Sequence, residues 1–412
     1  LIYLCLIFCN YIKYILTKEQ PKKVVMKIIK VELREVNGTL KTEKTFWEER
    51  LVRPIDIYPE YRSDSFNEAK WGSAEKKSNY PISAVFVEII TDNGLKGIGG
   101  PIDHSQAHII KEQLSHLLIN KDPLAIERLW DQMHRFQVHG RQGTPMIALS
   151  AVDCALWDLK GKYYNEPAYK IIGGPTRNKI PAYASMLGFA VEDLGLVKER
   201  ATEFKEKGYK AQKWFFRHGP MSGIDGFKKN ISMVKTLREV LGEDYDIMLD
   251  CWQSWDLNYA VKVTSYIEEY QPRWLEEVAM PDRIDTYRQL RQRTNIPLSG
   301  AEHEYTRWGF KRFVDQEALD ILQPDIYWAG GLSETLKIAN YASVHDLITI
   351  PHGHSSKAGI NFSVTQSPIH TPYQEYLEKW NTIHQFFLKN PIIPENGYIY
   401  LPKENGLGME YD

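Results

Sequence analysis

The sequence predicts an α/β fold, with a closed barrel of parallel strands and a smaller accessory domain. The chain has 412 residues, which is too long for one small core but suits a barrel of roughly 250 residues plus a second domain. From about residue 180 onward, short apolar runs alternate with helical periodicity, as in parallel βα repeats. Acidic residues end three successive runs at equal intervals of 26 residues, about the length of one repeat.

Residues 1–25 are expected to lie outside the folded core. Their apolar run, LIYLCLIFCNYIKYILT, is followed by the lysine-containing stretch EQPKK. The run has 17 residues, which is short for a membrane span, and it lacks the basic start and the cleavage site of a signal peptide. We interpret it as sequence upstream of a start at Met26, with a targeting segment as the alternative.

Residues 26–150 are predicted to form the smaller α+β domain. The runs KIIKVELREV and ISAVFVEIITDNG read as strands, and Asn93-Gly94 is a turn signal. The long segment between them, about 39–81, is a candidate lid because its aromatic and arginine side chains argue against disorder. Apolar periodicity near 3.6 then predicts helices in AHIIKEQLSHLLI and PLAIERLWDQMHRF.

Residues 151–380 are predicted to form the barrel, and residues 381–412 a tail of loops and turns that returns to the smaller domain. The alternation of strands and helices begins after a strongly apolar helix, MIALSAVDCALWDLKGKYYN. Seven or eight strands separated by helices imply closure of the sheet. The predicted strands are 180–186, 210–216, 246–250, 273–277, 297–302, 320–325, 348–354 and, as an eighth, 375–379.

The composition is that of an ordinary soluble globular protein, with 43% apolar and 25% charged residues. A net charge of −2 gives no basic surface, so we expect no nucleic-acid partner, and we expect no membrane contact for the folded domains. The cysteines show neither metal-ligand spacing nor the density of a disulfide framework, which favours a reducing, cytoplasmic location. They are Cys5, Cys9, Cys154 and Cys251.

The equally spaced acids Asp250, Glu276 and Glu302 predict a metal site. Ends of successive parallel strands meet at one rim, where three carboxylates repel each other unless a cation lies between them. Oxygen ligands favour a hard ion, so we expect one Mg²⁺ per subunit. A single such carboxylate would more often be a solvated loop residue. Neighbours in a strand point to opposite faces, and equal spacing favours Glu276 over Glu277 as the inward residue.

Asp325 and His352 follow the next two predicted strands and therefore lie on neighbours. A carboxylate that binds imidazole Nδ1 fixes the tautomer and raises the basicity of Nε2. Taken alone, a histidine followed by glycine is more often a hydrogen-bonded loop residue. The partner carboxylate and the nearby metal site favour His352 as a catalytic base, with His354 close by in the same IPHGHSS run.

The chain resembles the enolase superfamily, specifically its mandelate-racemase-like branch and most closely the L-rhamnonate dehydratase group. The resemblance implies a capping α+β domain, completed by the C-terminal tail, on a (β/α)7β TIM-like barrel, and a homo-oligomer. It implies the same three Mg²⁺ ligands and the Asp325–His352 pair, with His303 as a polar site residue and Glu375 near the end of the barrel. The matching motifs are LVRPIDIYPEYR, SAVDCALWDLKGK, LDCWQSWDLNYA, RWLEE, GAEHEYTRWGF, LQPDIYWAGG and IPHGHSS.

Two departures from the branch bear on the reaction. Racemases of the branch carry Lys-x-Lys on the second barrel strand, whereas this chain has Lys213 and then Phe215. Without the second base, racemisation is disfavoured, and dehydration can proceed with His352 alone. Lys213 is a catalytic candidate that would neutralise a substrate carboxylate oxygen, with a solvent-exposed lysine as the alternative.

The second departure concerns the cap and the substrate. The family's cap histidine has no counterpart in TEKTFWEER, and the loop NEAKWGSAEKKSNYP is unlike the family, so the sugar is expected to differ from rhamnonate. Arg62 and Trp252 remain as substrate-binding candidates. The predicted reaction is Mg²⁺-dependent dehydration of a small-molecule acid sugar to a 2-keto-3-deoxy acid. A cycloisomerase or epimerase on the same site is the first alternative, and a catalytically silent sugar-acid-binding barrel is the second.

Overall fold

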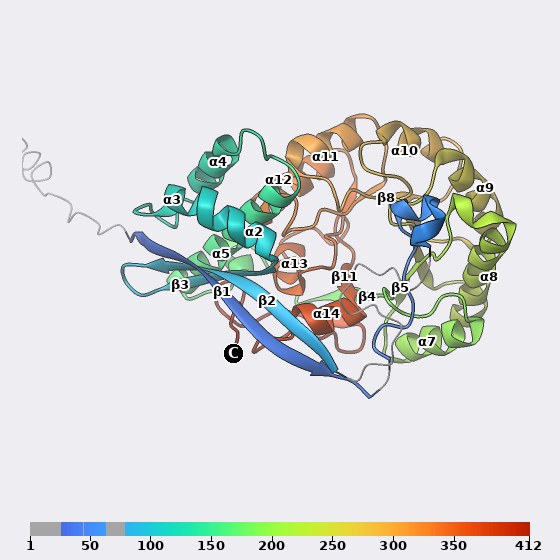
Figure 1. Ribbon diagram of the computed structural model, residues 1–412, viewed down its shortest axis with the longest axis horizontal. Coiled ribbons are helices and arrows are strands. Elements are labelled where there is room, and N and C mark those ends of the chain that lie inside the picture. The colour runs from blue at the N-terminus through green and yellow to red at the C-terminus, as the bar shows by residue number, and fades with distance from the viewer. Residues whose placement is uncertain (1–25, 44, 63–78) are drawn as a thin grey trace, which may run out of the picture.

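The computed structural model describes residues 26–43, 45–62 and 79–412. The expectations for residues 1–25 and for most of the loop NEAKWGSAEKKSNYP therefore concern segments outside the described residues. The described chain forms a small antiparallel sheet beside a curled parallel sheet that helices surround (Figure 1). This confirms the predicted α/β fold, with an antiparallel N-terminal part and a barrel-like parallel sheet. No helix in the described ranges is long and apolar enough to cross a membrane.

The antiparallel sheet contains the two predicted N-terminal strands and one more. Its order is β1 (Ile28–Lys41), β2 (Asn79–Thr91) and β3 (Lys96–Ile102). Helix α5 (Thr144–Tyr164) packs closely on β3. Gly97 permits this close approach because it has no side chain, and a β-carbon there would overlap the carbonyl oxygen of Ala155. The other helices of this part are α2 (His104–Ile109), a π-helical turn η3 (Ile110–Leu114), α3 (Ser115–Leu118) and α4 (Ile126–Phe136).

The parallel sheet has eight strands in the order β10-β9-β8-β7-β6-β5-β4-β11. They are β4 (Lys179–Ser185), β5 (Ala211–Phe215), β6 (Asp246–Asp250), β7 (Trp274–Glu276), β8 (Leu298–Gly300), β9 (Ile321–Leu322), β10 (Ile348–Thr349) and β11 (Gln374–Leu377). The edge strand β10 contacts the segment just before β11: the Thr349 amide donates to His370 O at 2.8 Å, and the Thr349 carbonyl accepts from the Thr371 hydroxyl at 2.8 Å. The sheet is therefore curled like a barrel, with its two edge strands near each other but not paired with each other in the described residues.

Helices follow the strands and cover the outside of the parallel sheet (Figure 1). Their apolar faces and the outer sides of the strands form the largest core cluster. Local signals fix where they begin: the Asp256 carboxylate, for example, accepts the Tyr259 amide at 2.9 Å at the start of α9. These helices are α6 (Ala168–Ile172), α7 (Leu194–Glu206), α8 (Gly223–Leu241), α9 (Leu257–Ile267), α10 (Ile284–Arg291), α11 (Thr306–Asp315), α12 (Gly331–Ser343) and α13 (Ser356–Ser363).

The C-terminal tail is more regular than the sequence predicted. We expected loops and turns in residues 381–412, but α14 (Glu378–His384) continues into this region and β12 (Tyr398–Tyr400) pairs antiparallel with β4. The alternation of β12 buries Ile399 against the barrel, a signal too short to stand out in sequence. The tail also reaches the antiparallel sheet, where Tyr411 stacks on Phe86 of β2 with ring centroids 4.5 Å apart. It thus contacts both parts of the molecule.

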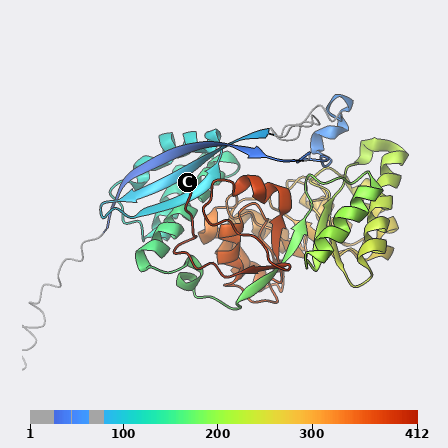
Figure 2. The ribbon, with the colours of Figure 1, turned by 90° about the horizontal axis from the view of Figure 1, so that it is seen from below.

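A segment of the N-terminal part crosses from the antiparallel sheet to the barrel (Figure 2). It contains the short turns η1 (Pro54–Ile57) and η2 (Pro59–Tyr61). The Val52 amide donates to Phe216 O at 2.8 Å, and the Glu48 amide donates to Gly188 O at 2.7 Å. These contacts hold the segment over the carboxyl ends of β4 and β5, where the predicted site lies.

Candidate active site

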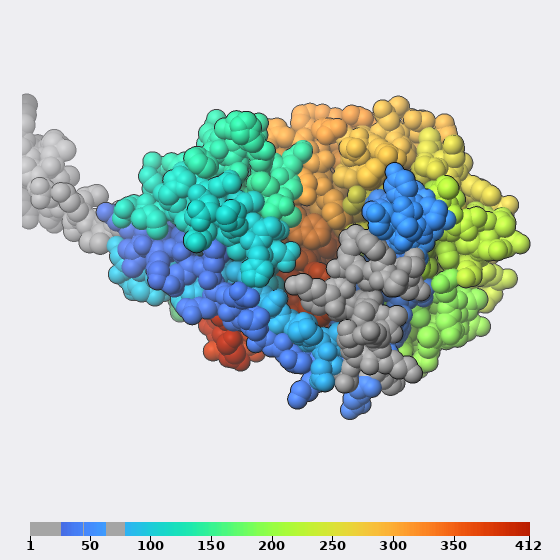
Figure 3. All heavy atoms as spheres, viewed as in Figure 1, coloured from blue at the N-terminus to red at the C-terminus, as the bar shows by residue number. Residues whose placement is uncertain are grey.

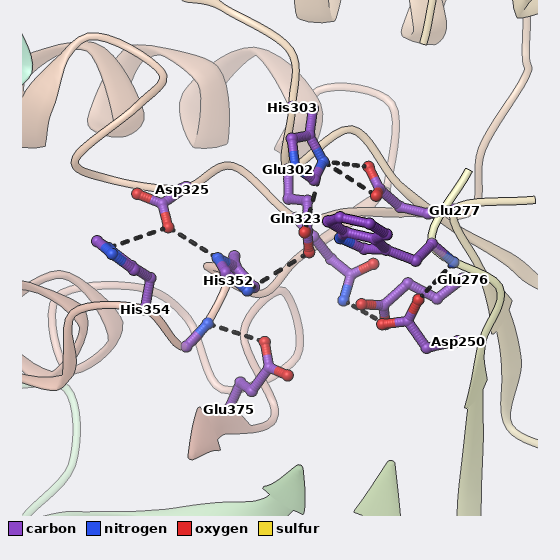
Figure 4. Close-up of polar contacts among 12 residues, drawn as sticks. Asp250, Glu276, Glu277, Glu302, His303, Gln323, Asp325, His352, His354 and Glu375 are labelled. Carbon is purple, nitrogen blue, oxygen red and sulfur yellow. Dashed lines mark hydrogen bonds and ion pairs between the residues drawn. The ribbon is translucent and has the colours of Figure 1, made fainter. Parts of the chain in front are cut away.

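The predicted site residues come from successive strand ends and lie around one cavity of about 160 Å³ (Figure 4). Six of them line it, namely Lys213, Asp250, Trp252, Glu302, His303 and His352. Asp325 hydrogen-bonds to His352, while Glu276 and Glu375 lie beside Lys213. In the space-filling view the surface is hollowed between the teal helices and the blue residues 45–62, with orange and red atoms at the bottom (Figure 3).

The Asp325–His352 pair has the geometry of a held base. His352 Nδ1 lies 2.8 Å from Asp325 Oδ2, and Asp325 Oδ1 accepts the Tyr327 amide at 2.7 Å. Nδ1 is placed to donate to Asp325, and Nε2, which lies 3.6 Å from Glu302 Oε2, is the nitrogen that faces the acids of the site. Burial opposes the charged imidazole, but Glu302 and Asp325 outweigh it and raise the pKa of His352 to about 10. The arrangement can take up a proton and keep it.

Lys213 lies inside the barrel, at the centre of three carboxylates. Its Nζ is 3.1 Å from Asp250 Oδ2 and 2.8 Å from Glu375 Oε1, and it also forms an ion pair with Glu276. The solvent-exposed alternative for this lysine is wrong, since its side chain is only 1% exposed. Burial would lower the pKa of Lys213, yet the three acids raise it well above its ordinary value.

Glu375 connects this ion cluster to the loop that carries the base. Its Oε2 accepts the Gly353 amide at 2.8 Å, one residue after His352, while Oε1 faces Lys213. Burial would raise the pKa of Glu375, but Lys213 and His352 outweigh burial and lower it. Glu375 therefore stays ionised and positions the His352 loop.

Both residues of the Glu276–Glu277 pair face the site, so the expectation that only one could is wrong. Glu276 accepts from Trp274 Nε1 and Gln323 Nε2, each at 2.8 Å, within the barrel. Glu277 has a φ of 44°, outside the extended range, so strand alternation no longer applies to it. Its side chain turns back toward the rim of the site.

One group of side chains in the described residues has atoms close enough to share a cation: Glu277, Glu302 and His303 lie within 4.8 Å of one another. Glu277 Oε2 is 3.0 Å from His303 Nδ1. Burial opposes the charged imidazole, but the negative charges of Glu277 and Glu302 raise the pKa of His303 to about 9. Asp250 and Glu276 converge instead on Lys213. The ligand trio Asp250, Glu276 and Glu302 therefore stays a prediction, with Glu277 as an added candidate.

The charge balance of the cluster fits a bound divalent cation. Burial raises the pKa of Asp250 to about 6 and that of Glu302 to about 7, because their negative charges are poorly compensated. Burial also raises the pKa of Glu276 well above its ordinary value, although Lys213 is in contact. Carboxylate oxygens are the ligands that Mg²⁺ prefers. Lys213 and the imidazoles of His303 and His352 supply positive charge beside these acids, and a divalent cation among them would add to it.

The remaining substrate-binding candidates differ in where they lie. Trp252 lines the cavity, and its amide donates to Asp250 Oδ1 at 2.9 Å. Arg62 does not line it; the guanidinium donates to the carbonyl oxygens of Asp56 at 2.7 Å, Ile57 at 2.8 Å and Met221 at 3.0 Å. Arg62 thus braces the segment that crosses to the barrel, and its substrate role remains only a prediction.

Sequence reasoning overlooked most of the cavity's apolar and aromatic wall. Trp328 lies between the histidines, with its ring centroid 5.1 Å from that of His352 and 5.2 Å from that of His303. Its position in the LQPDIYWAGG motif, shortly after Asp325, was the available signal. The sequence had named Phe215 and His354; the other wall residues, which it did not single out, are Leu51, Leu187, Leu377 and Trp380.

Comparison with known proteins gives a consistent picture. Residues 196–412 match the family described as enolase C-terminal domain-like, and residues 76–173 match the mandelate racemase / muconate lactonizing enzyme N-terminal domain. L-rhamnonate dehydratase of Saccharopolyspora erythraea is 31% identical over 372 residues, which cover 88% of this chain and 89% of the relative.

Two solved structures are similar over nearly the whole chain. Rhamnonate dehydratase from Gibberella zeae complexed with Mg is 27% identical with a TM-score of 0.81 and covers 95% of each chain. The 3,6-anhydro-D-galactonate cycloisomerase from Zobellia galactanivorans is 29% identical with a TM-score of 0.74, covering 94% of this chain and 97% of the other.

Proposed function

Because this chain belongs to the mandelate racemase / muconate lactonizing enzyme family of the enolase superfamily, we propose that it is a Mg²⁺-dependent acid sugar dehydratase. The substrate would be an aldonic acid and the product a 2-keto-3-deoxy acid. The observation that carries the proposal is the single held base, His352 on Asp325, in a cavity whose wall has Phe215 rather than a second lysine.

Asp250, Glu276 and Glu302, with Glu277 as the added candidate, would hold the Mg²⁺. When bound, the ion supplies Lewis-acid stabilisation of the negative charge that develops on the substrate carboxylate. Lys213 holds two of these acids and Glu375 in fixed positions. The chain's own contribution is therefore a rigid, buried set of charges beside the base.

His352 performs both proton transfers in the proposed dehydration. Its Nε2 removes the proton from C2, and the electron pair of that C–H bond forms the double bond to C3 as the C3–O bond breaks. The imidazolium then returns the proton to the departing hydroxyl, which leaves as water. The resulting enol loses the proton of its C2 hydroxyl to solvent and takes up a proton at C3 to give the keto acid. Asp325 stabilises the imidazolium between these steps.

The neighbouring cycloisomerase supports a second candidate function. An isomerase of an unusual sugar acid would use the same base for the same first proton transfer but would release no keto acid by loss of water. Product analysis separates the two reactions. A silent sugar-acid-binding barrel, the third reading, would exchange no α-proton at all.

A library of acid sugars, incubated with the protein and Mg²⁺, tests the proposal. At least one aldonate should yield an α-keto acid that reacts with semicarbazide, and its C2 proton should exchange in D₂O. An isomerised product without keto acid favours the second candidate. The absence of both keto acid and C2 exchange for every acid contradicts any catalytic function for this site.

We further propose a homo-oligomer that works in a reducing cytosol. The homologous dehydratases make a small acid sugar the expected partner. Cys154 and Cys251 are buried free thiols, which a reducing compartment would preserve. Light scattering on the purified protein checks the oligomeric state.

A further inference from the structure

A second cavity, of about 270 Å³, adjoins the catalytic one. It lies between the β2–β3 part of the antiparallel sheet and helix α14, and its wall includes Ile82, Ile102 and His384. Trp328, His354 and Trp380 line both cavities, so the two cavities meet at these three side chains. The second cavity is called the histidine chamber below, after His354 and His384.

The two histidines of the chamber lie in contact and have unmet hydrogen-bonding capacity. Their ring centroids are 4.2 Å apart. Within the described residues, His354 Nδ1 and His384 Nε2 are buried and have no hydrogen-bond partner. The nearest acid to His354, Asp325, has its Oδ2 3.7 Å away, beyond hydrogen-bond range. Buried polar atoms in this condition are costly, so a ligand hydroxyl that met them would be strongly favoured.

Both imidazoles are neutral near pH 7. Burial, with a smaller contribution from neighbouring histidines, lowers the pKa of His354 and of His384 to about 3. A neutral imidazole has one donor and one acceptor nitrogen; a hydroxyl group can pair with either nitrogen, whereas a carboxylate can pair only with the donor. The chamber is therefore suited to the uncharged end of an acid sugar.

The chamber lies on the side of the base away from Glu276, Glu277 and Glu302, although Asp103 is part of its own wall. The rings of His352 and His354 are nearly parallel, at 12°, with centroids 6.2 Å apart. Asp325 and His352 stand between His354 and the Glu276–Glu277–Glu302 group (Figure 4). A substrate whose carboxylate faces these acids and whose C2 faces His352 would extend its remaining carbons toward His354.

The rest of the wall is also suited to a sugar chain. Trp328 and Trp380 offer aromatic faces, and Ser83 and Gln106 add polar groups on the side of the antiparallel sheet. Binding sites for small molecules commonly combine such an apolar wall with a few placed polar groups.

We propose that the histidine chamber receives the terminal, hydroxylated carbons of the acid sugar, and that His384 selects a terminal hydroxymethyl group over a methyl group. This inference rests on the proposed function. It implies that the substrate ends in a hydroxymethyl group, whereas rhamnonate ends in a methyl group. A methyl group would leave the imidazole nitrogens buried and unpaired, whereas a hydroxyl would satisfy them.

L-Mannonate and L-rhamnonate test the inference, because they differ only by the hydroxyl at C6. The wild-type protein should show a kcat/KM for L-mannonate roughly five- to tenfold above that for L-rhamnonate, as expected for one buried hydrogen bond. His384→Phe keeps a flat ring without nitrogen and should abolish this preference. His384→Gln, which can still hydrogen-bond, should retain part of it.

The control is His345→Phe, an exposed histidine outside both cavities, which should leave the ratio unchanged. If His384→Phe does not fold by circular dichroism, His384→Met is the second apolar variant, with the same expected ratio. A wild-type protein that does not prefer L-mannonate, or a preference that survives both apolar variants, overturns the chamber assignment.

Failure of the dehydratase proposal would be visible separately. If neither acid gives a keto product, calorimetry with Mg²⁺ measures the two dissociation constants instead, and their ratio in wild type and His384→Phe decides the chamber assignment. Tighter binding of L-mannonate that depends on His384 supports it without any reaction. If neither acid binds, the chamber assignment is overturned together with the substrate class.

Discussion

Two regions of this molecule bury carboxylates, and they do so in different ways. At the barrel mouth, Asp250 and Glu302 line a cavity, and Lys213 forms ion pairs with Asp250 and with the neighbouring Glu276. At the junction of α5 and α12, Asp153 lines neither the catalytic cavity nor the histidine chamber. Its two oxygens accept from the hydroxyl and the amide of Ser333 at 2.6 and 3.0 Å.

The comparison shows that a raised pKa alone does not mark a site. Burial raises the pKa of Asp153 to about 7, as it does for Glu302. Asp153 has hydrogen-bond donors and no second acid in contact, so its burial serves packing. Glu302 faces a cavity, a base and further acids, so its burial concentrates charge where a ligand can reach it. Convergence on a cavity, together with poorly compensated charge, is the more informative sign.

Removing the base should have the largest effect on the mouth region. His352→Asn is expected to abolish C2 proton exchange, a loss of about 10²- to 10⁴-fold for a general base, while Mg²⁺ binding and the fold persist. Proton NMR in D₂O measures the exchange, and the exposed His345→Asn variant is the control. Full activity of His352→Asn would assign the base to another residue.

Removing Lys213 should show how much the positive charge beside the buried acids of the site contributes to the stability of the protein. Lys213→Met leaves three buried acids without their counter-charge and should lower the free energy of unfolding by about 3–5 kcal/mol. Added Mg²⁺ should restore part of this loss, because the cation meets the same acids. Urea denaturation with and without Mg²⁺ measures both effects.

Lys379→Met is the matched control for the lysine experiment. Lys379 is also buried, but it donates to Gly188 O at 2.8 Å and lies outside both cavities. Mg²⁺ should therefore raise the free energy of unfolding of Lys379→Met by no more than it raises that of the wild-type protein. Equal restoration of the two variants would show that the cation does not bind beside Lys213.

Variants of Glu276 and Glu277 distinguish the two candidate ligand sets for Mg²⁺. The sequence predicts Asp250, Glu276 and Glu302, whereas the structure brings Glu277, Glu302 and His303 together. The equal spacing predicts that Glu276→Gln weakens Mg²⁺ binding about 10- to 100-fold, and more than Glu277→Gln does. Calorimetry of the two variants measures the affinities. The reverse order would assign the ion to the Glu277–Glu302–His303 group that the structure brings together.

The sequence was informative where short-range pattern determines structure. Acids after apolar runs placed Asp250, Glu302 and their neighbours at one rim, because strand ends of a parallel sheet must meet there. The ion pair of Lys213 with Glu375 was beyond reach, since it requires β11 to return beside β4. The backbone turn at Glu277 was equally hidden, because nothing local forces a positive φ on a glutamate.

His384 shows the same limit in the tail. We read residues 381–412 as loops and turns, yet α14 extends into that region and places His384 against His354. The helix is short, with only Trp380 and Ile383 as apolar markers, and its stability comes from packing against the barrel rather than from propensity. Contacts of this kind depend on the tertiary fold and cannot be predicted from the sequence of a single segment.

The other side of the comparison, the buried acid at the α5–α12 junction, should show a stability that changes with pH. Asp153 has a pKa of about 7 in the folded chain and an ordinary value of 3.8. Between these values the unfolded chain loses a proton that the folded chain keeps, so the contribution of Asp153 to stability falls as pH rises. The slope is about 1.4 kcal/mol per pH unit.

Asp153→Asn should remove this slope, because asparagine stays neutral at every pH. Relative to wild type, the variant should gain about 1.4 kcal/mol for each unit between pH 4 and 7 and gain no more above pH 7. Urea denaturation at pH 5, 6 and 7 measures the difference, with Asp131→Asn as the control, since Arg135 lowers the pKa of Asp131 and keeps it ionised across this range. A constant difference between Asp153→Asn and wild type would mean that Asp153 is ionised in the fold, and the contrast with Glu302 would then rest on geometry alone.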